Sequence, residues 1–141
     1  MPVTDELRIV VDTNLLVSFL IGKHVGSLLP LILEQKVILL FSPELQLEFF
    51  EVVRREKFRK YFTEARIAEL QILLDGQSEI LVVNSVVNIC RDSKDNFLLA
   101  LAQDGKADYL ITGDSDLLEL KQHFATKIVT IREFSILNPS P

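Results

Sequence analysis

The chain has 141 residues, of which 48% are hydrophobic and 25% charged, and its net charge is −5 at pH 7. This size and composition fit one globular domain; they exclude an intrinsically disordered chain and a protein that binds nucleic acid through overall positive charge. One cysteine excludes a disulfide framework, and no apolar run is long enough to span a membrane. Since the N-terminus also lacks a signal core, we expect a cytoplasmic single domain over residues 1–141.

Apolar runs and helical segments alternate along the chain. Short runs rich in β-branched residues predict buried strands at 7–12, 36–41, 79–83, 107–113 and 127–131. Helical spacing and cap residues predict helices at 13–22, 26–35, 42–55, 63–76 and 93–105, and a short one near 116–122, with Ser42 and Thr63 as the caps of two of them. This alternation predicts an α/β domain with a mostly parallel sheet, a core from about 7 to 132 and a loose tail at 138–141.

Carboxylates lie at or near the ends of these predicted strands, where α/β sheets bind ligands. Asp12 closes the first strand, and Asp114 and Asp116 follow the strand at 107–113. Asp95 lies in the first turn of its helix, and Glu48 falls at the border of the inward face of another. Capping or turn formation could explain several of these acids singly, so the pattern depends on their coming together.

Several carboxylates in one crevice would repel one another unless a cation neutralised them. The chain has two histidines and one cysteine, which is too few for a zinc site of the usual kind. Oxygen ligands suit hard divalent cations, and we therefore predict Mg²⁺ or Mn²⁺. A carboxylate metal site with room for water and substrate is typical of phosphate-ester hydrolysis.

One basic run contrasts with the acidic average. RREKFRK, residues 54–60, has five basic side chains and one acidic side chain. A run of this kind is either a solvated helix face or a patch that follows a phosphate backbone beside the acidic site. In the second case, Arg54, Arg55 and Lys57 would bind the phosphates of a nucleic acid.

Four segments together resemble the acidic motifs of PIN-domain nucleases. They are VVDTN at 10–14, Glu48 within ELQLEFFEVV, DSKDNFLLALA at 92–102, and YLITGDSDLL at 109–118. Their order and separations are similar to those of the small VapC-like toxin components of toxin-antitoxin systems. The resemblance covers the chain from Asp12 to about residue 131. It implies a three-layer α/β/α fold, metal-dependent endonucleolytic cleavage of RNA, homodimers, and a cognate antitoxin protein that blocks the site.

The resemblance also implies roles for individual residues. Asp12, Glu48, Asp95 and Asp114 would be the acids of the four motifs, with Asp116 assisting, and Asp92 would be a helix cap. The metal ligands would be the four aspartates of the site: Asp12, Asp95, Asp114 and Asp116. Asn14 and Thr112 would orient carboxylates or a water molecule. Many VapC toxins have Asn where Asp114 stands, so the sequence leaves open whether Asp114 or Asp116 binds the metal directly.

Two other functions are compatible with parts of the pattern. A phosphatase of the haloacid-dehalogenase type also ends its first strand in Asp, but needs a second Asp at the position occupied here by Asn14. A catalytically silent module with the PIN fold could bind RNA or a protein, although all the acids are intact.

Overall fold

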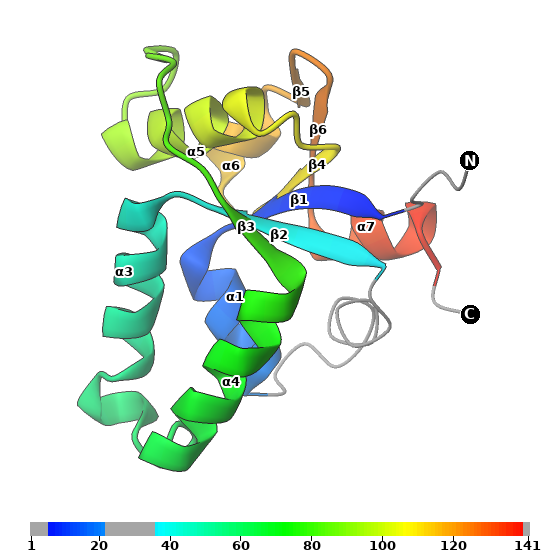
Figure 1. The fold of residues 1–141 in the computed structure, drawn as a ribbon. Helices are drawn as coiled ribbons and strands as arrows, with labels where there is room; N and C mark the ends of the chain where they lie inside the picture. The colour runs from blue at the N-terminus through cyan, green and yellow to red at the C-terminus, as the bar shows by residue number, and fades with distance from the viewer. Residues whose placement is uncertain (1–5, 22–35, 140–141) are drawn as a thin grey trace.

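The computed structural model describes residues 6–21 and 36–139 (Figure 1). Within these residues, six strands form one sheet in the order β3-β2-β1-β4-β6-β5. All neighbouring pairs are parallel except β5 and β6, which are antiparallel. The strands are β1 (Leu7–Val11), β2 (Val37–Phe41), β3 (Ser78–Ile80), β4 (Tyr109–Ile111), β5 (Gln122–His123) and β6 (Thr126–Val129). The predicted α/β fold with a mostly parallel sheet is confirmed.

Helices cover both faces of this sheet, which gives three layers (Figure 1). One face carries α1 (Thr13–Leu20), α3 (Pro43–Val53) and α4 (Glu64–Gln77), and the other carries α5 (Ser93–Asp104) and α6 (Ser115–Leu118). Crossovers between parallel strands are right-handed. The connections from β1 to β2 and from β2 to β3 therefore lie on one face of the sheet, and those from β3 to β4 and from β4 to β6 lie on the other. In the described ranges, 6–21 and 36–139, no helix has the length and apolar character needed to cross a membrane.

The two central strands are buried on both faces, which explains their continuous apolar sequence. Ile9 and Val10 of β1 and Leu110 and Ile111 of β4 are fully buried. β1 and β4 are paired in parallel, with Val11 opposite Ile111. The residues that follow these two strands therefore leave the sheet side by side at its carboxyl edge.

Helix starts follow the predicted capping residues. The Ser42 hydroxyl accepts the Leu45 N–H at 3.0 Å at the start of α3, where Pro43 occupies the first helical position. The Asp92 carboxylate accepts the Lys94 N–H at 2.9 Å and caps α5, as predicted.

The strand predicted at 79–83 is shorter in the structure. β3 ends at Ile80, because its neighbour β2 ends at Phe41 and the last ladder bond runs from Leu81 N–H to the Phe41 carbonyl. Residues 81–92 then run beside α5 (Figure 1), where Asp104 accepts the N–H groups of residues 84 and 85 and Asn96 accepts those of residues 89 and 90. Side chains of α5 thus replace a sheet neighbour for this segment.

The C-terminal prediction is wrong in part. The strand predicted at 127–131 ends at Val129, and Thr130 begins α7 (Ile131–Leu137) with a capping box to Glu133. Phe134 of α7 is fully buried and packs edge-on against Tyr109 at a centroid distance of 5.2 Å. The core therefore extends beyond residue 132. The helix predicted at 26–35 lies outside the described residues.

Candidate active site

The candidate site lies at the carboxyl ends of the neighbouring strands β1 and β4, whose following connections leave on opposite faces of the sheet. β1 is followed by elements on one face and β4 by α6 on the other, and the strands are neighbours (Figure 1). The Asp12 N–H donates to the Ile111 carbonyl at 3.1 Å, so the two strand ends are joined directly. Open α/β sheets bind ligands at such a point. Asp12 and Asp114 are therefore placed at this edge by the topology.

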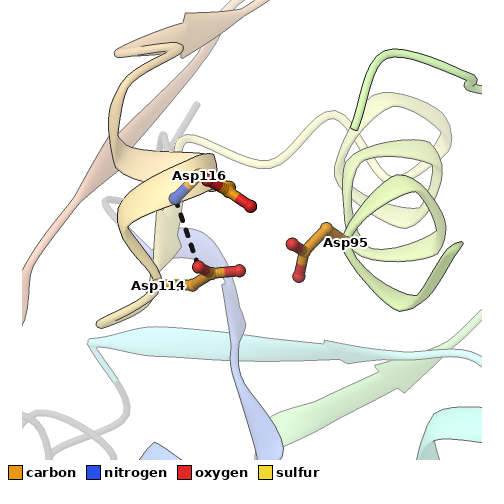
Figure 2. Close-up of side chains that lie close together, drawn as sticks. All are labelled: Asp95, Asp114 and Asp116. Atoms are coloured by element: carbon orange, nitrogen blue, oxygen red, sulfur yellow. Dashed lines mark hydrogen bonds between the residues drawn. The ribbon is translucent and has the colours of Figure 1, made fainter. Parts of the chain in front are cut away.

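Three carboxylates meet at this edge. Asp95, Asp114 and Asp116 each offer one oxygen, and these oxygens all lie within 4.8 Å of one another. Figure 2 shows Asp95 reaching from α5 toward Asp114 and Asp116, which lie at the start of α6. All three were among the acids predicted from the sequence. Residues 19 and 21 positions apart in the chain thus come close together.

Local hydrogen bonds fix the orientation of Asp114. Its Oδ1 accepts the Asp116 N–H at 3.2 Å, which caps α6 (Figure 2). Its own N–H donates to the Thr112 hydroxyl at 3.1 Å, and Thr112 is buried. Asp114 is therefore both a helix cap and a member of the carboxylate group, and the Thr112 hydroxyl contacts its backbone N–H.

Asp95 is the most constrained of the three carboxylates. It is 6% exposed, and its Oδ2 has no hydrogen-bond partner within the described residues. Burial, and after it the neighbouring Asp114 carboxylate, together raise the pKa of Asp95 to about 7. A buried carboxylate without a donor is destabilising, and a bound cation would remove the penalty.

The donor set fits Mg²⁺ or Mn²⁺. All three groups are carboxylates, which are the ligands that hard divalent cations prefer. Ligand oxygens of an octahedral magnesium ion are about 2.9–4.2 Å apart, since the bonds are about 2.1 Å long. The separation of up to 4.8 Å lies slightly above this range, so small side-chain rotations would suffice to bring the oxygens onto one ion.

Asp12 lies next to this group and outside it. Its Oδ1 accepts the Asn14 N–H at 3.0 Å and caps α1. Burial raises the pKa of Asp12, and the charges of Glu48 and Asp114 raise it as well. Asn14 contacts Asp12 through its backbone N–H rather than through the side chain that was predicted to orient a carboxylate.

Glu48 is not brought to the three aspartates. One of its oxygens accepts the Thr13 hydroxyl at 3.0 Å, and the other accepts the Lys94 ammonium at 3.4 Å. The sequence placed Glu48 at the border of the inward face of its helix, and its carboxylate is half-buried in the structure. The structure supplies two partners, and they are protein groups rather than the other acids.

A cavity of about 810 Å³ lies beside these groups. Its lining includes Asp12, Glu48, Asp95 and Asp114. Of the three residues predicted to bind RNA, Arg55 lines the cavity. The other two lie against aromatic rings, with Arg54 at 5.7 Å from the centroid of Phe50 and Lys57 at 5.0 Å from that of Phe58.

Two cations were not predicted as site residues, Arg91 just before α5 and Lys94 in its first turn. The Arg91 guanidinium lies 3.7 Å from the Asp116 carboxylate, and Lys94 binds Glu48. Both alternate with acids in RDSKD, residues 91–95. This alternation beside a predicted catalytic acid is a signal that could have drawn attention to them.

Comparison with known proteins agrees with this geometry. The family model described as PIN domain matches residues 8–116, a range that contains Asp12, Glu48 and the three carboxylates Asp95, Asp114 and Asp116. The chain belongs to the PIN-domain family. A relative from Methanocaldococcus jannaschii, the uncharacterized protein MJ1680, is 33% identical over 139 residues, which cover 96% of this chain and 88% of the relative. PIN domains are in general nucleases, and this membership favours a nuclease over a phosphatase of the haloacid-dehalogenase type.

Proposed function

We propose that the protein is an endoribonuclease that depends on Mg²⁺ or Mn²⁺ and hydrolyses phosphodiester bonds of RNA. The observation that carries the proposal is the buried Asp95 carboxylate, which lies within 4.8 Å of Asp114 and Asp116 beside a cavity and has one oxygen with no hydrogen-bond partner among the residues that the structure describes. A folded domain gains no stability from three adjacent carboxylates, so a charged ligand is the physical reason for the arrangement.

Each residue of the site has a task in this proposal. Asp95, Asp114 and Asp116 would hold the divalent ion, which when bound supplies Lewis-acid chemistry to a phosphoryl group. The Thr112 hydroxyl keeps Asp114 in place through the Asp114 N–H. Asp12, whose pKa is raised, is suited to hold a water molecule or a second charge beside the group. Arg55 gives the cavity a positive charge for the phosphate backbone.

The experiment that tests this proposal is cleavage of a mixed RNA pool by the purified protein in Mn²⁺ and in EDTA. The Asp95→Asn variant, purified in parallel, controls for a contaminating nuclease. We expect cleavage by the wild-type protein in Mn²⁺ and none in EDTA or with the variant. Equal cleavage by the variant would refute the role of Asp95, and a wild-type protein that binds RNA without cleaving it would favour the silent binding module.

We also propose that the protein is the toxin of a toxin-antitoxin pair, acts in the cytoplasm as a homodimer, and is blocked by a cognate antitoxin protein. The support is the likeness of its four acidic motifs to those of VapC toxins and the small size of the chain. Induced expression in a bacterial host tests this role. Growth arrest by the wild-type protein that disappears with Asp95→Asn is expected, and equal growth of both strains would refute it.

A further inference from the structure

Glu48 and Lys94 form an ion pair that is separate from the group of Asp95, Asp114 and Asp116. The pair joins α3 to the first turn of α5, 46 positions apart in the chain. Behind it, the Thr13 hydroxyl donates to the second Glu48 oxygen at 3.0 Å, and Thr13 is itself 8% exposed. The Glu48 carboxylate is thus fixed from the buried side and presents its other oxygen to the lysine.

The Lys94 side chain is 79% exposed, although its ammonium is held at Glu48. An ammonium has three N–H donors, and within the described residues the structure assigns one of them, to Glu48. Free lysine side chains sample many rotamers, and an anchored one loses less entropy when it binds a ligand. The lysine is therefore presented in a defined place with donors to spare.

The cavity is lined by more acidic than basic side chains, so each cation in it matters for binding a polyanion. Six carboxylates line the cavity, against the two cations Arg55 and Lys94. Both cations line this cavity together with Asp95 and Asp114, and Lys94 is in the same helical turn of α5 as Asp95. A polyanion that enters this cavity meets repulsion from the acids except where a cation compensates it.

We propose that Lys94 binds a non-bridging oxygen of a phosphate group in the RNA backbone, beside the place where Asp95, Asp114 and Asp116 would hold a divalent ion, and that Glu48 is the residue that positions this lysine. This inference rests on the proposed function. It assigns Glu48 a role different from that of the three aspartates, because its contacts are to Thr13 and Lys94.

Binding in EDTA tests the lysine without the catalysed reaction. Labelled single-stranded RNA is titrated with the protein and followed by fluorescence anisotropy over a range of KCl concentrations. We expect Lys94→Gln to weaken binding about three- to tenfold, since one charge-assisted contact is lost. The slope of log K against log salt should fall by about 0.7, as for one phosphate contact on a single strand. Lys127→Gln, which removes an exposed lysine on β6, is the matched control and should change neither quantity appreciably.

The direction in which Glu48→Gln changes RNA affinity distinguishes a residue that positions Lys94 from one that only adds negative charge. If Glu48 were only a negative charge near RNA, Glu48→Gln would tighten binding, as we expect for Glu44→Gln at another cavity carboxylate. If Glu48 positions Lys94, Glu48→Gln weakens binding, and the loss disappears in the Lys94→Gln background. Tighter binding by Glu48→Gln, or an equal loss in both backgrounds, would overturn the positioning role.

The remaining outcomes distinguish this inference from the proposed function. A phosphate contact predicts the same loss for single-stranded DNA of the same sequence, so a loss confined to RNA would place Lys94 at the ribose and overturn the proposal. Wild-type-like RNA binding by Lys94→Gln, or no binding by the wild-type protein in EDTA, would also overturn it. The proposed function fails on a different result, namely no cleavage by the wild-type protein in Mn²⁺.

Discussion

The Asp95→Asn substitution should stabilise the metal-free protein at alkaline pH. Asparagine keeps the size of the buried side chain and removes its charge. The pKa of Asp95 is raised to about 7, first by burial and then by Asp114. A carboxyl whose pKa is higher in the folded state favours folding below its unfolded pKa, and that contribution is lost as the pH rises through the folded value. The wild-type protein should therefore lose stability between about pH 4 and pH 7.

The size of the effect follows from the two pKa values. The change from an ordinary aspartate value of about 3.9 to about 7 corresponds to roughly 4 kcal/mol, at about 1.4 kcal/mol for each pKa unit. This is an upper value, because Asp114 interacts with the same proton. For a domain of this length, 1 kcal/mol shifts the melting temperature by about 3 °C. We expect the variant to melt about 5–10 °C above the wild-type protein at pH 8.

Thermal unfolding by circular dichroism in EDTA at pH 4.5 and pH 8 measures this difference, with Asp75→Asn on the exposed face of α4 as the control. The wild-type protein and Asp95→Asn should have similar melting temperatures at pH 4.5, and Asp95→Asn should have the higher one at pH 8. Added Mg²⁺ should raise the melting temperature of the wild-type protein at pH 8 and leave the variant unchanged. A wild-type melting temperature that is independent of pH, or a variant that is destabilised at pH 8, would refute the reasoning.

Three further outcomes follow from particular contacts. Asn96→Ala removes the side chain that accepts two backbone N–H groups of residues 81–92. The free energy of unfolding measured in urea should fall by about 2–4 kcal/mol, and amide exchange in this segment should become faster. Unchanged exchange would contradict this. Phe134→Ala should cost about 3–5 kcal/mol, because Phe134 is fully buried, and a loss below 1 kcal/mol would show α7 to be peripheral. Arg55→Gln should weaken RNA binding more than Arg54→Gln, since Arg55 lines the cavity; the reverse order would place the RNA elsewhere.

Features that depend on neighbours in the sequence were predictable. The apolar strands β1 and β2 and the caps Ser42, Thr63 and Asp92 are confirmed, because a cap hydrogen bond joins residues two or three positions apart. The same kind of local signal exists at α7, where Thr130 and Glu133 form a capping box. The prediction of a strand at 127–131 gave the apolar run more weight than this box.

Contacts between distant segments were predictable only in outline. The end of β3 at Ile80 depends on where β2 ends, and the path of residues 81–92 depends on Asn96 and Asp104 of α5. No periodicity in these residues carries that information. An extended segment looks the same in sequence whether a strand or a helix side chain binds its backbone.

The sequence by itself determined that acids stand at the carboxyl ends of parallel strands, because strand periodicity and chain order fix that edge. The sequence could not determine which of these carboxylates lie close together in the fold. The tertiary structure brings Asp95 to Asp114 and Asp116, and it leaves Glu48 with Thr13 and Lys94. The physical reason is that distances between side chains of different elements depend on how α3 and α5 pack against opposite faces of the sheet, and helix packing is set by the whole core.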